Sequence, residues 1–448
     1  MTRVLCVDFG STFTKAALVD SDDGALVATA SHPTTIATDV LDGYHAIRQT
    51  LAGERVEEVL ACSSAGGGLR LAVVGYEQLV TAEAGHRVGL SAGARVVHVA
   101  AGELTADGVR ELRESRPDVV LLVGGTDGGN AEVLCHNARR LGIGRLSAPV
   151  VLAGNIQAAA QAEHELTSRG RRVTVTANVL PRIGVLDPEP ARAAIREVFI
   201  RHVIGGKGLS KGPQFADMVR AATPDVVLAG VSVLADGGPG VAGLGDVVVV
   251  DVGGATTDVY SALAPEGEDA TLHKEVVATM WHARTVEGDL GMRWNATGVV
   301  AAARAEHLPV DHHLAGYADR VQAEPGYLPG LASEIRYDLR LAELAATVAL
   351  RRHGRAANPS AAPRPLRDVA LVVGSGGVLR HHDDAARAQV LAPAVSDHGG
   401  GWRVPEQARL AVDDRYVLFA AGLLAPHAPG AAAGLASGSL REVPRLGR

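Results

Sequence analysis

A short segment near the start of the chain combines a carboxylate with the small and hydroxyl-bearing residues that suit phosphate binding. Asp8 follows an apolar run and is followed in turn by Gly10, Ser11, Thr12 and Lys15. A glycine lets the backbone approach a phosphate, while hydroxyl and backbone N–H groups donate to its oxygens. Asp8 could hold Mg²⁺ through water, because Mg²⁺ keeps much of its hydration shell, and Lys15 would bring a cation near the terminal phosphates. The alternative is a β-hairpin with a polar turn.

The same design recurs in the second half of the chain. Asp251 follows a run of valines and precedes Gly253, Gly254, Thr256 and Thr257. Another hairpin turn is again the alternative, but two such turns, each headed by an aspartate after a buried strand, argue against coincidence. We therefore predict that two opposed turns enclose a polyphosphate and that the two aspartates converge on one Mg²⁺.

A third glycine-rich segment follows a predicted strand late in the chain. It consists of Gly374, Ser375, Gly376 and Gly377, and glycines at such a turn would let a nucleoside lie against the backbone. A tight strand-to-helix turn is the alternative. A Rossmann fingerprint is excluded, because G-x-G-x-x-G would need a glycine where Leu379 stands. The P-loop pattern G-x-x-x-x-G-K-[ST] does not occur either.

The elements that must position these residues alternate as strand and helix. Short β-branched runs, several apolar on both faces as in buried parallel sheets, predict strands at 3–7, 96–99, 118–123, 150–152, 173–176, 225–228, 247–252 and 368–373. Helical patterns are predicted at 106–115, 132–141, 158–168, 189–203, 215–222 and 333–353. This alternation predicts an α/β fold with an open parallel sheet in at least part of each half.

The order of features predicts an internal duplication. Each half has an aspartate turn and, later, a strand that ends in glycines, at 124–126 in the first half and at 374–377 in the second. We predict a first domain over residues 1–238, a second over 239–424 and a flexible Ala/Gly/Pro-rich tail over 425–448. The boundary is placed between Ala235 and Gly245, where the glycines predict irregular structure.

Composition narrows the function classes. The 448 residues carry 43 basic and 50 acidic side chains, a formal charge of −7, which argues against nucleic acid and against a polybasic membrane surface. Aromatic residues make up only 3%, so the core must be aliphatic. Three distant cysteines, Cys6, Cys62 and Cys135, form neither a disulfide framework nor a zinc motif, and no targeting or membrane-spanning segment is recognisable. We predict a cytoplasmic protein.

Other candidate motifs receive simpler interpretations. The glycine-rich loop 124–130 could bind an anion or sense a nucleotide through Thr126 and Asp127, or it could be a turn that helps pack the domains. The run 381–384, His-His-Asp-Asp, is interpreted as a solvated turn, since neighbouring residues point in different directions. Cys135 and His136 are interpreted as helix packing. No cobalamin-binding Asp-x-His-x-x-Gly string occurs.

The two D-x-G turns and the later G-x-G-G turn resemble the actin/hsp70/sugar-kinase superfamily of ATPases. The resemblance implies two duplicated, ribonuclease H-like domains with Mg-ATP in the cleft between them. It makes 8–15 the first phosphate loop, 251–257 the second and 374–377 the adenosine loop. The segment 284–291 is similar to one that opens a helix in this superfamily, where Glu287 and Asp289 would face the nucleotide or act as helix N-terminal acids.

Over most of its length the chain also resembles the MutL/GlmL accessory proteins of glutamate mutase. The matching strings are 7–15, 122–130, 251–258 and 284–293, whereas the chain after Gly354 departs from the pattern. The resemblance implies an ATP-dependent factor that reactivates an adenosylcobalamin-dependent mutase. It further implies ATP and Mg²⁺ as ligands, mutase subunits as partners, cobalamin held only by such a partner, and a possible homodimer.

The mechanism expected from these residues is slow Mg-dependent ATP hydrolysis. Asp251 would orient the attacking water and Asp8 would position the metal, while the two turns and Lys15 spread the charge that develops on the γ-phosphoryl group. A small-molecule kinase of the same superfamily is the alternative enzyme, although no acceptor pocket is identifiable. An actin-like polymer is a third possibility, against which the acidic charge argues.

Overall fold

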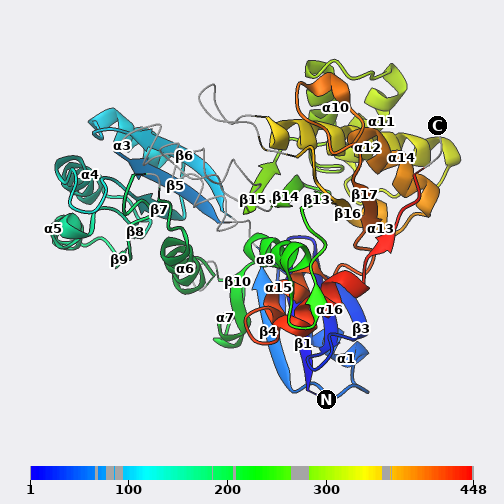
Figure 1. Ribbon diagram of the computed structural model, residues 1–448, viewed down its shortest axis with the longest axis horizontal. Helices are drawn as coiled ribbons and strands as arrows, with labels where there is room; N and C mark the ends of the chain where they lie inside the picture. Colours follow the sequence, from blue (N-terminus) through cyan, green and yellow to red (C-terminus); the bar gives the residue numbers. More distant parts are fainter. Residues whose placement is uncertain are drawn as a thin grey trace. The chain divides into compact units, whose positions relative to one another are not determined.

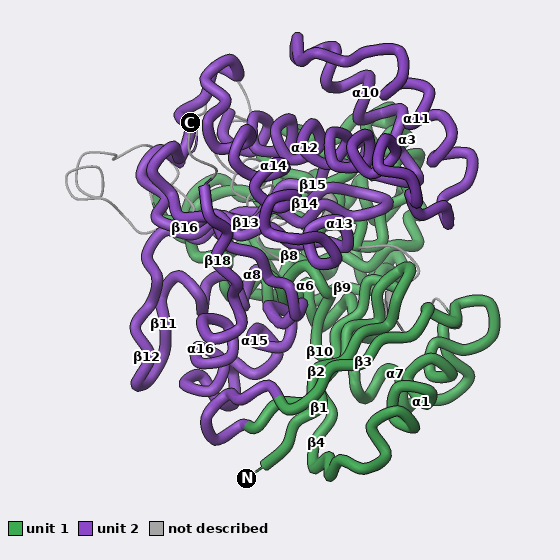
Figure 2. The backbone as a smooth tube through the Cα atoms, turned by 90° about the vertical axis from the view of Figure 1, so that its right-hand side faces the viewer, with its two compact units in different colours: residues 1–20, 27–227, 265–280 green, residues 21–26, 228–264, 281–448 purple. Residues whose placement is uncertain are grey.

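The computed structural model describes residues 2–65, 69–76, 85, 94–183, 185–204, 208–263, 282–355, 364 and 366–445. These residues form two compact units, coloured separately in Figure 2. With the gaps just given, unit 1 contains residues 2–20 and 27–227, and unit 2 contains residues 21–26, 228–263 and 282–445.

The first sheet has the strand order β10-β4-β1-β2-β3. Strand β1 is antiparallel to β2 and parallel to β4, and β10 is parallel to β4. Helix α1 (Val40–Thr50) covers the face that carries Leu5, Val7 and Phe9. The strands are β1 (Arg3–Phe9), β2 (Phe13–Asp20), β3 (Leu26–Pro33), β4 (Glu58–Ser63) and β10 (Val219–Ala222).

The second sheet, in unit 2, repeats this arrangement in the order β15-β14-β13-β16-β17-β18. Strand β13 is antiparallel to β14 and parallel to β16, which is parallel to β17. The long helix α12 lies along one face of it (Figure 1), packed with α10, α11 and α14 in one apolar core. The strands are β13 (Val247–Val252), β14 (Thr257–Ala262), β15 (His282–Glu287), β16 (Leu371–Ser375), β17 (Arg409–Val412) and β18 (Arg441–Glu442), and the helices are α10 (Ala296–Ala305), α11 (His312–Ala323), α12 (Ala332–Gly354) and α14 (Asp384–Ala394).

The matching strand orders confirm the predicted α/β fold with two duplicated domains. They also correct how the halves were aligned. Strand β16, which leads into the turn at Gly376, corresponds to β4, because each is the parallel neighbour of the aspartate-bearing strand. The glycine motif at 124–126 is therefore not the counterpart of 374–377. Residues 66–68, which come shortly after β4 in the sequence, lie outside the described part of the chain.

A third sheet is inserted between β4 and β10 and accounts for the length of unit 1. Its five strands are all parallel, in the order β6-β5-β7-β8-β9. Helices α3, α4 and α5 cover one face, and α6 covers the other (Figure 1). The elements are β5 (Arg70–Gly75), β6 (Arg95–Ala101), α3 (Ala106–Glu114), β7 (Val119–Leu122), α4 (Glu132–Ile143), β8 (Val150–Leu152), α5 (Ile156–Thr167), β9 (Val173–Val175), α6 (Glu189–Val198) and a π-helix, Phe199–Ile204.

The segment before the second sheet differs most from the sequence prediction. The helix predicted at 215–222 is the short helix α7 (Gln214–Met218) followed by β10, and the strand predicted at 225–228 is part of helix α8 (Thr223–Asp236). In α8 the buried residues Val227, Val231 and Leu234 follow helical spacing, which outweighs the local β-branched signal. The glycine-rich stretch after it forms a small hairpin, β11 (Gly237–Gly238) and β12 (Val241–Ala242), rather than irregular structure.

The prediction of a flexible tail from residue 425 is wrong for the residues that the structure describes there. Helix α15 (Leu418–Leu424) is followed by α16 (Pro429–Gly438), whose Ala432 and Ala436 are fully buried, and then by β18. Alanine is the best helix former, and proline suits the first helical position. The small side chains also let α16 approach the β11–β12 hairpin at Gly238.

The remaining predicted strands and helices are present with small shifts of their ends. The largest shift concerns 368–373, since β16 begins at Leu371 and includes Gly374 and Ser375. All three cysteines are buried, and they form no disulfide bond within the described part of the chain. Within the described ranges, no helix combines the length and the apolar character that a membrane crossing needs. Helix α13 (Gly377–Arg380) and a 3₁₀ turn, His398–Gly400, complete the elements of unit 2 used below.

Candidate functional site

The first predicted phosphate turn joins β1 to β2 and is braced from the turn after β3. The Gly10 N–H donates to the Phe13 carbonyl at 3.2 Å, which closes the turn. Thr34 donates hydrogen bonds to two carbonyl oxygens of the turn. Its hydroxyl donates to the Gly10 carbonyl oxygen at 2.8 Å, and its N–H donates to the Thr12 carbonyl oxygen at 2.9 Å. Ser11 and Thr12 are exposed. Because acceptors of the turn are satisfied from one side, donor groups remain to face a ligand.

Asp8 lies at the end of β1, on the face opposite helix α1, and is only 1% exposed. Its Oδ1 accepts a hydrogen bond from the Thr223 hydroxyl at 2.5 Å and a longer one from the Cys62 thiol at 3.6 Å. Its Oδ2 lies 3.8 Å from the position that a Cβ would take at Gly10, so this oxygen is directed towards the turn. Lys15 is the register partner of Asp8 on β2 and therefore shares its face of the sheet.

The second predicted phosphate turn has the same backbone design. The Gly253 N–H donates to the Thr256 carbonyl at 2.9 Å, and the carbonyls of Gly253 and Gly254 accept from the N–H groups of Met292 and Arg293 at 3.0 and 2.8 Å. Gly254 is exposed at the tip. As in the first turn, a neighbouring segment satisfies the carbonyl oxygens and fixes the loop.

Asp251 lies at the end of β13, opposite Asp258 in the β13–β14 register. Asp258 is held by two donors, the Arg284 guanidinium at 3.0 Å and the Thr256 hydroxyl at 3.2 Å. Arg284 is buried and lies over the ring of Tyr260. Burial raises the pKa of the Tyr260 hydroxyl. This cluster places a fixed positive charge near the two carboxylates on the face of the sheet that bears Asp251.

Thr256 and Thr257 of this turn differ in their surroundings. Thr257 is completely buried, and its hydroxyl donates to the Leu290 carbonyl at 2.6 Å. Thr257 thus anchors the turn to the segment after β15, whereas Thr256 is partly exposed and bonded to Asp258. The segment around Leu290 is itself tightly packed, since a Cβ at Gly291 would lie 2.3 Å from the Ala255 carbonyl oxygen.

The predicted adenosine loop adjoins the second turn within unit 2. Gly374 and Ser375 are the last residues of β16, and Ser375 is the register partner of Asp251. Gly376 has φ of +105°, and a Cβ there would lie 2.2 Å from the Val252 carbonyl oxygen. Gly377 is exposed, with nothing within 4 Å of its Cβ position, and opens helix α13.

The segment 284–291 does not open a helix, contrary to the sequence expectation. Its first part belongs to strand β15, and the next helix, α10, begins only at Ala296. Glu287 and Asp289 both form ion pairs with Arg352 of α12, each at 2.7 Å. Arg352 holds the pKa of Asp289 below its ordinary value, while burial raises the pKa of Glu287. These two acids therefore fix the segment to α12 rather than cap a helix.

The predicted site residues thus fall into two groups, each assembled within its own unit. Gly10, Ser11, Thr12, Asp8 and Lys15 lie together in unit 1. Unit 2 brings together the residues of the second turn and of the adenosine loop, namely Asp251, Gly253, Gly254, Thr256, Thr257, Gly374, Ser375, Gly376 and Gly377. That the two groups meet around one ligand stays a prediction.

Sequence reasoning missed the residues that brace the turns. Thr34 and Thr223 lie far from Asp8 in the chain and belong to no motif, and Cys62 was considered only as a possible disulfide or metal residue. Arg284 and Arg293 were seen only as part of a matching string. The Thr-Pro pair at 223–224 was the one available signal, because a proline in the first turn is common at the start of a helix.

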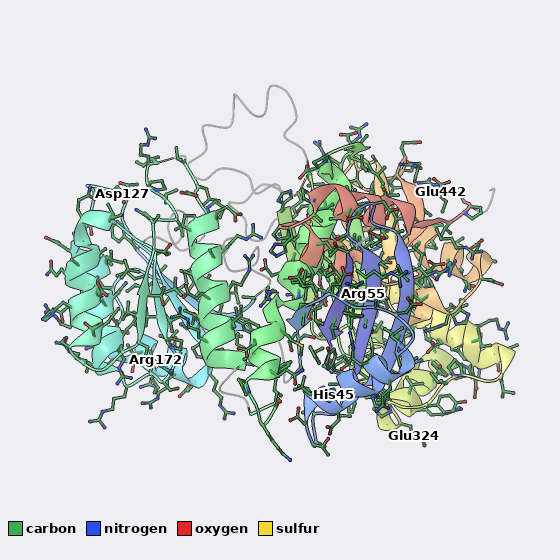
Figure 3. The ribbon with its side chains drawn as sticks, turned by 90° about the horizontal axis from the view of Figure 1, so that it is seen from below. His45, Arg55, Asp127, Arg172, Glu324 and Glu442 are labelled. Atoms are coloured by element: carbon green, nitrogen blue, oxygen red, sulfur yellow. The ribbon has the colours of Figure 1, made fainter. Side chains whose placement is uncertain are left out.

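The other candidate motifs have structural roles in the described part of the chain. In the loop 124–130, Asp127 accepts hydrogen bonds from the buried Asn178 side chain at 2.9 Å and from the Ile156 N–H at 3.0 Å. Figure 3 shows Asp127 and Arg172 at opposite ends of the inserted sheet. Asp383 caps helix α14, and no group of three or more metal-binding side chains occurs among the described residues.

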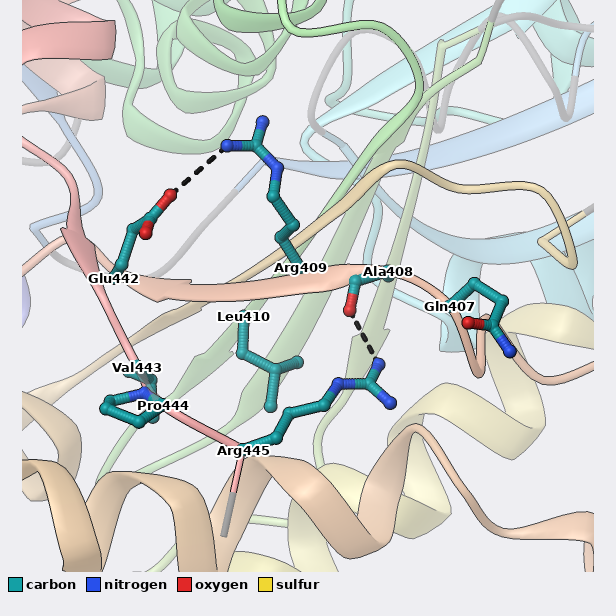
Figure 4. A pocket seen from close by; sticks show the side chains of 8 residues that line it. All are labelled: Gln407, Ala408, Arg409, Leu410, Glu442, Val443, Pro444 and Arg445. Carbon is teal, nitrogen blue, oxygen red and sulfur yellow. Dashed lines mark hydrogen bonds and ion pairs between the residues drawn. The ribbon is translucent and has the colours of Figure 1, made fainter. Parts of the chain in front are cut away.

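A shallow pocket of about 400 Å³ lies along strands β17 and β18 of unit 2 (Figure 4). It is lined by Arg409, which pairs with Glu442 at 3.2 Å, and by Arg445, which donates to the Ala408 carbonyl at 2.6 Å. Leu410 lies between them in the view of Figure 4. None of the predicted site residues lines this pocket.

Comparison with known proteins places the chain in a family. The family model described as MutL protein matches residues 4–440. The chain belongs to the MutL family. Protein MutL of Clostridium tetanomorphum is 35% identical over 452 residues, a match that covers 96% of this chain and 97% of that protein. The matched residues include both predicted phosphate turns and the predicted adenosine loop.

Solved structures overlap the MutL chain along its length but at low similarity. A ligand-bound xylulose kinase from Lactobacillus acidophilus is 11% identical, with a TM-score of 0.35, and covers 99% of this chain and 93% of its own. The activator of the 2-hydroxyisocaproyl-CoA dehydratase from Clostridium difficile, with bound ADPNP, is 10% identical, with a TM-score of 0.30 and coverages of 98% and 96%. At these TM-scores the overlaps carry no argument about function.

Proposed function

We propose that this MutL-family chain is a Mg-dependent ATPase that reactivates an adenosylcobalamin-dependent mutase of the glutamate mutase type. One observation carries the proposal: the two sheets end in turns of identical backbone design, each headed by an aspartate at the end of the central strand. Family membership and the resemblance to glutamate mutase accessory proteins support the choice of partner.

The residues of the two turns suit a magnesium nucleotide. In each turn the carbonyl oxygens are satisfied by a neighbouring segment, and a Cβ at Gly10 or Gly253 would lie 2.5 or 2.7 Å from the carbonyl oxygen that closes the turn. Phosphate oxygens need donors, which the N–H groups and the exposed hydroxyls of Ser11 and Thr12 supply. Asp8 and Asp251 are the carboxylates that would hold Mg²⁺ through water.

Hydrolysis then follows from charge stabilisation and positioning. The donors of both turns and Lys15 stabilise the charge that develops on the γ-phosphoryl group. Asp251 orients the attacking water, and Asp258 and Arg284 hold its surroundings rigid. A bound Mg²⁺ supplies further neutralisation of the phosphate charge. The adenosine lies against the backbone at Gly376 and Gly377.

ATP hydrolysis would serve to change the conformation of the protein rather than to phosphorylate a metabolite. The ATP-bound state, with its γ-phosphate, and the state after hydrolysis favour different arrangements of the two units. The mutase subunit binds these two arrangements with different affinity. Turnover then loosens the partner and releases a damaged cofactor. Cobalamin is held by the partner, in keeping with the missing cobalamin-binding string in this chain.

The test combines purified chain, Mg-ATP and glutamate mutase inactivated by turnover, in the presence of fresh adenosylcobalamin. We expect recovery of mutase activity that requires ATP and is lost with a non-hydrolysable analogue and with Asp251→Asn. Arg172→Gln, a change on the amino-terminal side of the inserted sheet, serves as the matched surface control. Normal ATP hydrolysis without any recovery would refute the reactivation role. ATP consumption that rises only with an added sugar or short acid would instead indicate a kinase.

A further inference from the structure

The best-defined polar contact beside the first turn is one that no sequence motif indicated. Asp8 is 1% exposed, Thr223 is 8% exposed, and the two side chains are joined by a hydrogen bond of 2.5 Å across 215 residues of sequence. A bond of this length from a hydroxyl to a carboxylate is characteristic of a charge-assisted interaction. The Cys62 thiol, at 3.6 Å from the same oxygen, is a weaker second donor.

The two oxygens of the Asp8 carboxylate have different surroundings. Oδ1 points into the protein, where Thr223 and Cys62 hold it, while Oδ2 is directed towards Gly10 and the phosphate turn. An aspartate carboxylate can rotate about both the Cα–Cβ and the Cβ–Cγ bond, and a hydrogen bond to one oxygen restricts both rotations and so fixes the direction of the other oxygen. Without the hydroxyl, a buried oxygen would lose its short donor.

Thr223 is also the first residue of helix α8, and this gives the contact a second consequence. The division between the two compact units falls within α8, after Val227, so the helix belongs partly to each unit. The Asp8 carboxylate is therefore bonded to the start of the segment that leads out of its own unit. If ligand binding shifts Asp8, the hydrogen bond to Thr223 transmits the shift to the first turn of α8.

We propose that Thr223 is the positioning residue of Asp8, setting the direction of the carboxylate towards the phosphate turn and linking that turn to helix α8. The inference rests on the proposed ATPase function and adds to it a residue that touches neither nucleotide nor metal. Its hydroxyl, not its bulk, carries the role. Serine should therefore replace threonine, and the nearly isosteric valine should not.

The experiment compares Thr223→Val with Thr223→Ser in the full-length chain. Ser232→Ala is the matched control, because it removes a hydroxyl from the same helix that bonds only to the Leu228 carbonyl within α8. Two readouts are needed: steady-state ATP hydrolysis, and equilibrium ATP affinity measured with Mg²⁺ and again with EDTA. Thermal unfolding without nucleotide identifies any variant that has lost its fold.

For Thr223→Val we expect kcat to fall by about tenfold to a hundredfold, the range for losing a hydrogen bond to a charged group. The gain in ATP affinity on adding Mg²⁺ should shrink by on the order of tenfold, while affinity in EDTA stays within about twofold. Thr223→Ser should recover most of both losses, and Ser232→Ala should match the unaltered chain.

The outcomes separate this inference from the function on which it rests. If the unaltered chain neither binds nor hydrolyses ATP, the proposed function fails. If it does both, and Thr223→Val matches it in kcat and in the Mg²⁺ effect, the positioning role is refuted. Equal losses in the valine and serine variants would also refute it, because they would show that the side chain acts through packing alone.

Discussion

Replacing Gly376 by alanine tests whether the predicted adenosine loop has the close packing that its position requires. Gly376 has φ of +105°, and the added Cβ would lie 2.2 Å from the carbonyl oxygen of Val252 and 2.8 Å from its carbonyl carbon. Both atoms are backbone at the end of β13, directly after Asp251. Neither can move without displacing the second phosphate turn.

The magnitude follows from two contributions. Holding an L-residue at φ of +105° and ψ of +161°, a region essentially restricted to glycine, costs about 1–3 kcal/mol. Forcing apart atoms that would approach to 2.2 Å resembles overpacking of a core, which costs about 1–3 kcal/mol. Together these predict a loss of about 2–6 kcal/mol, which for a unit of this size corresponds to roughly 10 °C in the midpoint of thermal unfolding.

Gly377→Ala is the matched control. The neighbouring glycine has nothing within 4 Å of its Cβ position and opens helix α13, where alanine is favourable. Trp294 and Trp402 belong to unit 2, so the temperature dependence of tryptophan emission follows the unfolding of the affected unit. We expect a clearly lower midpoint for Gly376→Ala and an unchanged or slightly higher one for Gly377→Ala.

The result that would refute this reasoning is equal stability of the two alanine variants. It would mean that the loop does not rest on the end of β13. Binding of ATP provides a second readout, since displacement of the loop should weaken affinity in Gly376→Ala more than the stability loss alone explains. A variant that unfolds earlier yet binds ATP normally below its midpoint would show that the loop takes no part in nucleotide binding.

Three further predictions concern single side chains. Asp251→Ala should abolish ATP hydrolysis while leaving circular dichroism and the unfolding midpoint unchanged; retained turnover would contradict its assignment. Thr257→Val should cost about 1–3 kcal/mol in urea unfolding, because the Leu290 carbonyl loses a buried donor, and Thr257→Ser should not. The pKa of Glu334 is lowered to about 2, chiefly by the hydrogen bond from the Tyr327 hydroxyl. The ionised carboxylate therefore contributes fully to the free energy of unfolding above pH 4.5, and this contribution is lost as the pH falls towards 2. Glu334→Gln should therefore be less stable than the unaltered chain at pH 7 and should lose less stability between pH 4.5 and pH 2. If the stability of both proteins falls in parallel over this pH range, the prediction is refuted.

Much of the fold was predictable because buried parallel strands have a strong local signal. The runs that became β1, β7, β8 and β13 are short, β-branched and bounded by glycine or aspartate, and all were assigned as strands. The two aspartate turns, where we predict phosphate binding, could be located in the sequence for a related reason. Close backbone turns near phosphate tolerate few residue types, so glycine and threonine accumulate at fixed offsets.

The errors arose where pairing partners lie far apart in the sequence. Residues 219–222 become a strand only because they pair with β4, which precedes them by a whole inserted sheet. Residues 225–228 have a β-branched pattern but become helical through the burial of one face of α8. The insertion itself hid the true counterpart of the glycine turn at Gly376, since local motifs do not reveal which strand is the neighbour of β1.

The sequence by itself determined the two aspartate turns, the glycine-rich turn at 374–377 and the duplicated α/β character, because each depends on residue types within a few positions of one another. Tertiary structure alone decided what holds these residues: Thr223 and Cys62 on Asp8, Thr34 behind the first turn, and Arg284 beside the second. A hydrogen bond between side chains 215 residues apart depends on the whole path of the backbone between them. No local pattern of amino acids encodes such a contact.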